Sequence, residues 1–369
     1  MSTRDWALFG GRAEFTTPLA HGRNALPPWP RFEAEMRALF ERRWYTNQGP
    51  LTRRLEAELA QRLGRRHVVV VSNEMIAAIM AAECLDGRGE AWISVLAPSH
   101  VVQALVWAGY APRCFDVDGV DGEVDWAAAL RNAAGDARPA LVVDADPWGR
   151  GDAMPAALRA VDAPVLLDRS RTPLPAGELG GAAMVVGSLQ AEQALSALEG
   201  GYVALDDDAT AAKLRNIRSS YGAGAPVEVR KTSNGRMSEA QAAMALLSLE
   251  TLEERHRAHA ERAARWQAGL AKIPGLRRVG AAEGVYAVDA AAFGIDAPCL
   301  RRLLRAEGIE VRGHAMPDTT AYPRAAALAS SLLRLPQAEA ITMDEVDRAV
   351  ALVAAAQRDA PRIAHGMGG

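Results

Sequence analysis

Acidic side chains end two short apolar runs near the middle of the chain, where they could do acid–base chemistry. The run ALVVDAD carries Asp144 and Asp146, and the run APVLLD ends in Asp168. His100 opens a third apolar run, HVVQALVWAG. An imidazole titrates near neutral pH, so His100 is the best candidate for a general acid or base, although a histidine without a role at a helix start fits equally well.

Strand-like and helix-like runs alternate from residue 67 onward. HVVVVSN, AWISVLA, PRCFDVD, AAMVVGSLQ and GGYVALDDD are typical of buried strands, and IAAIMAAECL and VVQALVWAG of helices. This alternation favours a mostly parallel sheet with helices on both faces. In such folds the functional loops gather at the carboxyl ends of the strands, so the strand-end acids are where a site is expected.

Three parts of the chain are expected from composition and periodicity. Residues 1–30, with three prolines around Trp29, predict an extended arm, and residues 31–250 a large α/β domain. A helical run from residue 238 leads to a small C-terminal α+β domain over residues 251–369. Its predicted elements are GVYAVDA and IEVRGH as strands and CLRRLLRAEG and TMDEVDRAVALVAAAQ as helices, the last opened by a capping box of Thr342 and Glu345.

Charge and composition exclude several classes of function. The 42 basic and 45 acidic residues are mixed along the chain and give a net charge of −3, so nucleic-acid binding is not expected. No apolar run suits a signal peptide or a membrane span, which favours a cytoplasmic protein. Cys84, Cys114 and Cys299 match no zinc spacing and fit packing thiols, and the histidines are scattered, so no metal is expected.

Five segments in this order resemble the DegT/StrS family of nucleotide-sugar aminotransferases. They are TNQGPLTRRLEAELAQRLG, HVVVVSN, DPWGR, LEGGYVALDDD and TSNGRMSEAQAAMALLSLE. The resemblance covers about residues 44 to 350. It implies an aspartate-aminotransferase-like α/β fold (pyridoxal phosphate, PLP, fold type I), with a mostly parallel seven-stranded sheet in the large domain, and a homodimer.

The resemblance also assigns positions in a cofactor site. Asp168 stands where the family places the carboxylate that binds the pyridinium nitrogen, although an acidic strand end with only solvent contacts is the alternative. Ser188 keeps a family serine. Asn234 and Arg236 match residues that reach the cofactor phosphate of the partner subunit, or Asn234 only turns the chain before a helix. The family's Schiff-base lysine position is occupied by Gln193, whose amide is neither basic nor nucleophilic.

Further positions depart from the family pattern. Glu74 and Met75 occupy the phosphate-binding turn, where a carboxylate would repel a dianion. Pro98 falls at the stacking aromatic, Arg171 replaces a glutamine or histidine, and the hairpin RTPLPAGELGG is shortened. These changes predict that the PLP site is degraded and that no cofactor is used, with non-covalent PLP as the alternative.

A charged set would line the vacated site. Its members are Glu74, His100, Asp144, Asp146, Asp168, Arg169, Arg171, Ser188, Gln190, Glu192 and Gln193. Asp168, His100, Arg171, Glu74 and Gln193 are the candidate catalytic residues, and Asp168, Ser188, Asn234 and Arg236 the candidate ligand-binding residues. Convergent carboxylates, guanidinium groups and an imidazole could do cofactor-free acid–base work, but a collapsed, salt-bridged former site has the same composition.

Three functions follow from these expectations. The first is a PLP-independent enzyme of specialised metabolism that acts on a nucleotide sugar or a related small molecule. The second is a catalytically silent subunit that forms a heterodimer with an active paralogue and donates Asn234 and Arg236 to it. The third is a sugar aminotransferase or dehydratase that binds PLP non-covalently. His314 and Tyr322 are among the residues that would select the sugar.

Overall fold

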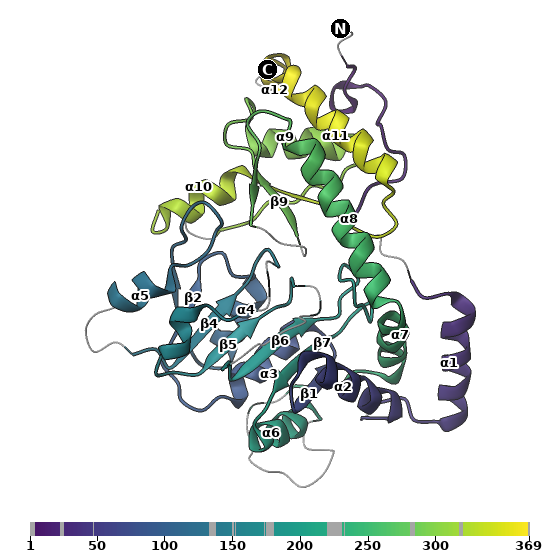
Figure 1. Ribbon diagram of the computed structural model, residues 1–369, viewed down its shortest axis with the longest axis vertical. Helices are drawn as coiled ribbons and strands as arrows, with labels where there is room; N and C mark the ends of the chain where they lie inside the picture. The colour runs from purple at the N-terminus through teal and green to yellow at the C-terminus, as the bar shows by residue number, and fades with distance from the viewer. Residues whose placement is uncertain are drawn as a thin grey trace. The chain divides into compact units, whose positions relative to one another are not determined.

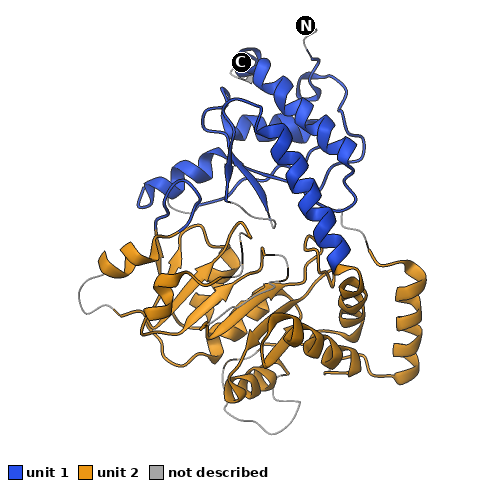
Figure 2. Cartoon of the chain, in the orientation of Figure 1, with its two compact units in different colours: residues 1–25, 116–123, 253–369 blue, residues 26–115, 124–252 orange. Residues whose placement is uncertain are grey.

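The computed structural model divides into two compact units (Figure 2). Unit 1 contains residues 1–25, 116–123 and 253–369, and unit 2 contains residues 26–115 and 124–252. The structure describes residues 4–22, 26–46, 48–132, 138–149, 151, 153–172, 174, 181–219, 231, 233–280, 285–316 and 320–367.

Unit 2 is built on a seven-stranded sheet in the order β1-β7-β6-β5-β4-β2-β3 (Figure 1). The strands are β1 (His67–Val71), β2 (Glu90–Ser94), β3 (Ala111–Phe115), β4 (Leu141–Ala145), β5 (Val165–Asp168), β6 (Met184–Ser188) and β7 (Gly201–Leu205). β7 is antiparallel to both of its neighbours, β1 and β6, and every other pair is parallel. The predicted α/β fold with a mostly parallel seven-stranded sheet is confirmed.

Helices flank this sheet in unit 2. They are α1 (Trp29–Arg42), α2 (Pro50–Leu63), α3 (Glu74–Cys84), α4 (Ser99–Trp107), α5 (Trp126–Asn132), α6 (Asp208–Arg218) and α7 (Glu239–Glu250), with a 3-10 turn over Ala156–Ala160. α2 ends at Gly64, whose φ of 59° is the left-handed conformation that glycine adopts most easily. The extended arm expected up to residue 30 ends earlier, because Pro28 caps α1 and Pro30 lies in its first turn.

Both faces of the sheet are buried, which explains its continuous apolar strands. In β1, Val68 and Val70 pack into a core with α2 and α7, while Val69 and Val71 pack into a second core with α3, α4 and α6. Each fully buried valine or leucine contributes about 1.5–3 kcal/mol. Covering both faces leaves the strand ends as the places where polar side chains can gather.

The free edge of β1 is covered by an ion pair instead of another strand. Glu56 accepts a hydrogen bond from the Val70 backbone N–H at 3.1 Å, and Arg218 donates to the Val70 carbonyl oxygen at 2.8 Å. Arg218 and Glu56 also pair directly with each other. The two side chains therefore occupy both backbone groups of Val70, which would otherwise be open to strand pairing with another chain.

Unit 1 is a smaller α+β body around a three-stranded antiparallel sheet in the order β10-β9-β8. Its elements are a 3-10 turn η1 (Ala7–Phe9), α8 (Leu252–Leu270, in this unit from Glu253), β8 (Arg277–Val279), β9 (Tyr286–Asp289), α9 (Ala297–Ala306), α10 (Pro323–Ser331), β10 (Leu332–Leu335), α11 (Met343–Arg358) and α12 (Ala360–Met367). The capping box is confirmed: Glu345 N–H donates to Thr342 Oγ1 at 3.2 Å, and Thr342 N–H donates to Glu345 Oε2 at 2.8 Å.

One predicted strand of the small domain is wrong. IEVRGH forms only isolated bridges, from Ile309 to Leu19 and from Arg312 to Arg334. Apolar and polar residues alternate in this segment as they do in a strand, but only isolated residues form bridges with the backbone of another segment. The strand that pairs with β9 is instead β10, which follows α10 directly.

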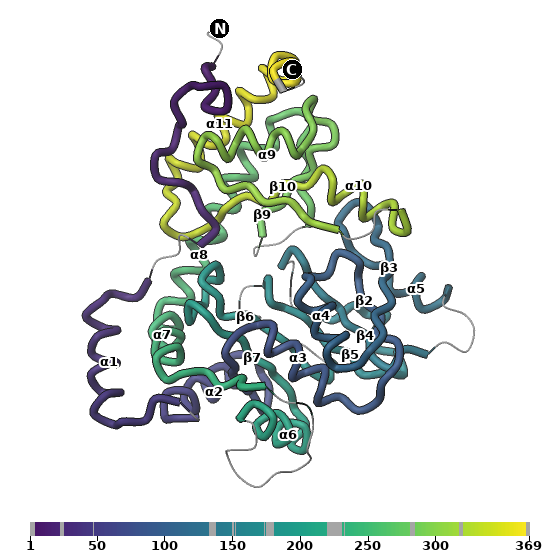
Figure 3. Tube along the Cα trace, turned by 180° about the vertical axis from the view of Figure 1, so that it is seen from behind, coloured from purple at the N-terminus to yellow at the C-terminus, as the bar shows by residue number. Residues whose placement is uncertain are grey.

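The N-terminal segment packs on unit 1, where η1 contacts α9 (Figure 3). Trp6, Phe15 and Leu19 are buried in the same apolar core as α9 and α11. Gly308 permits this approach, because its φ is +89° and an added Cβ would lie 2.4 Å from the carbonyl oxygen of Phe15. The segment is therefore an integral part of the unit 1 core.

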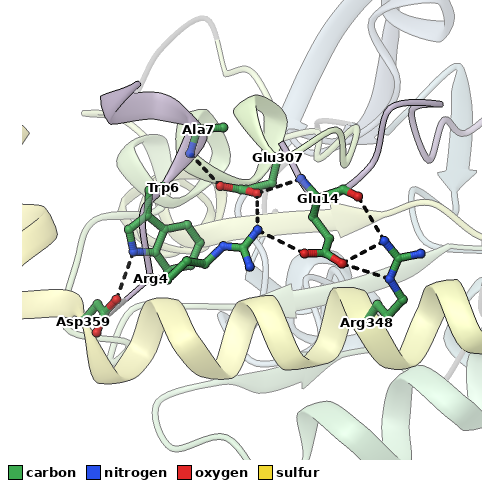
Figure 4. A network of polar contacts seen from close by, with 7 residues as sticks. All are labelled: Arg4, Trp6, Ala7, Glu14, Glu307, Arg348 and Asp359. Carbon is green, nitrogen blue, oxygen red and sulfur yellow. Dashed lines mark hydrogen bonds and ion pairs between the residues drawn. The ribbon is translucent and has the colours of Figure 1, made fainter. Parts of the chain in front are cut away.

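Glu307 fixes this segment through a buried carboxylate (Figure 4). Its side chain is 0% exposed and accepts hydrogen bonds from Arg4 Nη2 at 2.7 Å, Ala7 N at 2.8 Å and Glu14 N at 3.0 Å. The desolvation cost of a buried carboxylate is offset only by such hydrogen bonds and by its cationic partner.

We predict that Glu307→Ala lowers the free energy of unfolding by about 3–5 kcal/mol, because the N–H groups of Ala7 and Glu14 lose their acceptor and Arg4 keeps only Glu14 as its anionic partner. Urea denaturation of the variant measures this. The matched control is Glu254→Ala on the exposed side of α8, which should change stability by less than about 0.5 kcal/mol. Equal effects of the two substitutions would contradict the anchoring role of Glu307.

Candidate functional site

The candidate site lies at the carboxyl ends of the parallel strands in unit 2. Glu74 opens α3 three residues after β1 ends, and His100 lies in the first turn of α4 after β2. Asp168 ends β5, and Ser188 ends β6. Parallel strands that end at one edge bring these side chains to the same rim of the sheet.

Asp168 is a fully buried acid of this rim. It is 1% exposed, its Oδ1 accepts a hydrogen bond from Ser170 N at 3.1 Å, and its Oδ2 has no partner among the described residues. Burial raises the pKa of Asp168, the nearby His100 opposes the rise, and Glu74 adds to it. A buried carboxylate oxygen without a partner is a strong acceptor for a ligand N–H.

Glu74 lies between two groups that can carry positive charge. Its Oε1 is 3.6 Å from His100 Nδ1 and 3.7 Å from Arg171 Nη2. Glu74 Oε2 and His100 Nε2 are buried and have no hydrogen-bond partner within the described part of the chain. The carboxylate is thus electrostatically compensated, while two polar atoms stay open to a ligand.

The loop between β6 and β7 returns to the end of β5. Gln193 Nε2 donates to the carbonyl oxygen of Ser170 at 2.9 Å, and Arg171 Nη1 pairs with Glu192 at 2.7 Å. The position that the family resemblance assigns to the lysine therefore lies next to the segment that follows Asp168. Ser188 Oγ accepts a hydrogen bond from the backbone N–H of Gln190 at 3.3 Å.

Gly201 allows β7 to begin against the turn after β1. An added Cβ at this residue would lie 2.6 Å from the carbonyl oxygen of Asn73 and 2.9 Å from the Cα of Glu74. No side chain fits at that distance. The glycine therefore sets how closely the loop that carries Gln193 approaches the N-terminus of α3.

Asp144 and Arg169 form a separate buried ion pair. Arg169 Nη2 lies 2.7 Å from Asp144 Oδ2, and Trp126 Nε1 donates to Asp144 Oδ1 at 3.0 Å. Asp146 shapes its own turn by accepting backbone hydrogen bonds from Trp148 at 3.1 Å and Gly149 at 2.9 Å. The carboxylate oxygens of Asp144 and Asp146 are therefore already engaged within the protein.

Asn234 and Arg236 lie beside the end of β1. Gly235 accepts a hydrogen bond from Ser72 N at 2.9 Å, and Arg236 forms a bridge with Val71. Arg236 Nε donates to Asn234 Oδ1 at 2.9 Å, and Asn234 is exposed. This chain's own contacts therefore place the pair next to the Glu74 turn.

The start of α4 and the segment after Asp168 contain the other residues about which the sequence makes a prediction. Pro98 is the N-cap residue of α4, and most of the shortened hairpin RTPLPAGELGG lies outside the described residues. Ser170 is not among the predicted site residues, yet it is buried and its hydrogen bonds to Asp168 lower the pKa of that carboxyl against the effect of burial. Its only sequence signal is its place two residues after Asp168.

The described residues contain neither a metal-binding cluster nor a membrane-spanning helix. No group of three or more His, Cys, Asp or Glu side chains there could hold a metal ion. Within the same residues, no helix combines the length and the apolar character needed to cross a bilayer.

The sheet order and the buried acid at the end of β5 define a fold type I, aspartate-aminotransferase-like protein. Residues 30–354 match the DegT/DnrJ/EryC1/StrS aminotransferase family, and the chain belongs to this family. A dTDP-4-amino-4,6-dideoxy-D-glucose transaminase of Escherichia coli is 30% identical over 105 residues, a match that spans 28% of either chain.

Solved structures cover the chain more completely. DesI, crystallised in the presence of its TDP-sugar product, is 28% identical with a TM-score of 0.88, and the match covers 99% of both chains. Helicobacter pylori PseC, an aminotransferase involved in the biosynthesis of pseudoaminic acid, shares the fold at 18% identity and a TM-score of 0.78, over 91% of this chain and 98% of PseC.

The expectation that no cofactor is used is wrong. The family and its structural neighbours are PLP-dependent aminotransferases, which points to PLP as the cofactor. The physical reason for the error is visible at Glu74, which we expected to repel a phosphate dianion. The guanidinium of Arg171 lies 3.7 Å from its carboxylate and offsets its charge, and the ring of His100 lies 3.6 Å from the same oxygen.

The residues of the rim fit this cofactor at its ring nitrogen. Asp168 offers a buried, unpartnered Oδ2 as acceptor for a pyridinium N–H. That hydrogen bond would offset the cost of burying this carboxylate oxygen without a donor.

We predict that Asp168→Asn stabilises the cofactor-free protein at pH 7. The pKa of Asp168 is raised on folding, so the ionised carboxylate destabilises the folded state above that pKa. The gain should shrink as the pH falls toward about 4, where aspartate is also protonated in the unfolded chain. Thermal unfolding across this pH range measures the difference. The control Asp146→Asn should lose stability, and an equal loss for Asp168→Asn would contradict the interpretation.

Proposed function

We propose that the protein binds a nucleotide sugar, holds PLP or its amine form without a covalent bond, and is not a standard Schiff-base transaminase. The single observation that carries this proposal is Asp168, buried at the end of β5 with Oδ2 open. A buried carboxylate with an unused acceptor is retained against its cost to stability when a ligand supplies the missing donor.

The absence of a covalent link follows from Gln193. The family resemblance places the Schiff-base lysine at this residue, and the amide donates to Ser170. The nearest lysines in sequence are engaged elsewhere. Lys213 on α6 lies 3.7 Å from Asp86, and Lys231 donates to the carbonyl oxygen of Trp107, at the opposite end of α4 from His100. With about 1.5 Å of rise per residue, those ends of α4 are about 10 Å apart.

The side chains of this rim can bind, orient and move a proton. When bound, the cofactor supplies an electron-withdrawing ring. Asp168 would keep the ring nitrogen protonated through its Oδ2. His100 Nε2, which has no partner among the described residues, is the atom able to take or give a proton, and Glu74 Oε1 lies 3.6 Å from Nδ1. Arg171 contributes fixed positive charge because a guanidinium does not deprotonate.

A nucleotide sugar is the proposed substrate class because of the relatives. DesI covers nearly the whole chain and was solved with a TDP-sugar product, and the E. coli relative is a dTDP-sugar transaminase. These names support the class of substrate. They leave the particular sugar to binding measurements.

Cofactor titration followed by borohydride reduction tests the proposal. Dialysed wild-type protein should change the absorbance of PLP with saturation, and intact mass spectrometry after reduction should show no covalent adduct. Gln193→Lys should gain one reducible adduct, because it restores an amine beside Asp168. Asp168→Ala should weaken cofactor binding by about tenfold or more, the loss of one charge-assisted hydrogen bond.

Two results would overturn the proposal. Wild-type protein that fails to bind either PLP or pyridoxamine phosphate contradicts the cofactor site. A stoichiometric borohydride-reducible adduct in the wild type contradicts the non-covalent mode, since another amine would then reach the cofactor.

A second function is favoured by Asn234, which is exposed and held by Arg236 next to the β1 end. In this reading the protein pairs with an active paralogue and lends both residues to the partner's cofactor. Native mass spectrometry separates the two. A homodimer that binds PLP alone supports the first function, and a chain that dimerises only with a lysine-containing paralogue supports the second.

A further inference from the structure

Helix α8 carries a buried polar face that belongs entirely to unit 1. Arg255, His259, Arg262 and Trp266 are all buried and follow one another at spacings of four, three and four residues. This spacing places them on one side of the helix. That side meets the segment after β10, because Trp266 Nε1 donates to the carbonyl oxygen of Pro336 at 3.2 Å.

Arg262 is a buried cation whose hydrogen bonds go to neutral groups. It is 3% exposed, its Nε donates to the carbonyl oxygen of Gln337 at 3.0 Å, and its Nη1 donates to that of Glu339 at 3.3 Å. Nη2 has no partner among the described residues. Burial lowers the pKa of Arg262, and the nearby Glu339 and Glu261 only partly oppose this.

Gln337 adds further unused polar atoms at the same place. It is 5% exposed, and neither its Nε2 nor its Oε1 finds a hydrogen-bond partner in the part of the chain that the structure describes. The carboxylate of Glu339 is within 3.5 Å of Arg255. The buried face therefore places the guanidinium groups of Arg255 and Arg262 near the one carboxylate of Glu339. Two of its donors, Arg262 Nη2 and Gln337 Nε2, and one acceptor, Gln337 Oε1, have no hydrogen-bond partner among the described residues.

We propose that this cluster, formed by Arg262 and Gln337, binds a small oxyanion that carries a hydroxyl group, such as hydrogen phosphate or bicarbonate. The oxyanion accepts from Arg262 Nη2 and Gln337 Nε2, and its hydroxyl donates to Gln337 Oε1. A buried water molecule would satisfy the hydrogen bonds but would leave the buried positive charge uncompensated. The inference is independent of the proposed function, since no group of the strand-end rim takes part.

Thermal unfolding with added anions tests this site. Phosphate and bicarbonate should raise the unfolding midpoint of the wild type in a saturable way, and more than sulfate or chloride at the same pH and ionic strength. Neither sulfate nor chloride carries a hydroxyl for Gln337. Arg262→Met keeps an unbranched apolar side chain, removes the guanidinium group and its charge, and should abolish the shift. The control Arg265→Met, on the exposed side of α8 and paired with Asp347, should retain it.

Gln337→Glu provides an independent check, because it builds the missing negative charge into the protein. This variant should unfold at or above the midpoint of the anion-saturated wild type and gain no further shift from phosphate. Phosphate bound at the strand-end rim would instead stabilise Arg262→Met and the wild type equally. That equality, or a wild type that responds to no hydroxylated oxyanion, overturns the proposal.

Discussion

The sheet of unit 2 is covered on both faces, and this constraint decides where chemistry can occur. Side chains of β1 alternate between two apolar cores, so neither face has room for an unpaired polar group. Polar residues are excluded from the strand interiors and collect where the parallel strands end. The turn that begins with Glu74, the start of α4 and the segment after β5 are all consequences of that exclusion.

Three buried acids differ in the number of hydrogen-bond donors that their carboxylates meet, and this number distinguishes a structural acid from a candidate binding residue. Glu307 accepts three hydrogen bonds, including one from a cation, and Asp144 is bound by Arg169 and Trp126. Asp168 is equally buried, but its Oδ2 is open in the described structure. Acids of the first kind stabilise the fold. An acid of the second kind destabilises the fold until a ligand supplies the missing donor, and this difference is the basis for proposing Asp168 as a binding residue.

The sequence predicts the large sheet well because its signals are local. Continuous apolar runs suffice for strands buried on both faces, and the capping box at Thr342 needs only two residues. IEVRGH failed because a strand also needs a partner, and that segment has only isolated bridges. The roles of Asp144 and Asp168 could not be separated from sequence, since both end apolar runs and differ only in neighbours that folding brings together.

Contacts that form only on folding also explain why the sequence predicted a degraded cofactor site. Taken from the sequence alone, Glu74 is an isolated negative charge at the phosphate-binding turn, and such a charge predicts repulsion of a phosphate. In the alignment that the family resemblance implies, Lys becomes Gln at residue 193 while Gln or His becomes Arg at residue 171. In that alignment the cation lies on the loop after β5 instead of the loop between β6 and β7, and Arg171 is 3.7 Å from Glu74. A guanidinium preserves the electrostatic balance, but it cannot lose a proton or attack a carbonyl carbon. In the function proposed above, the rim keeps positive charge for an anionic cofactor and lacks the amine that would bond to it, so the imidazole of His100 is the group proposed to carry a proton.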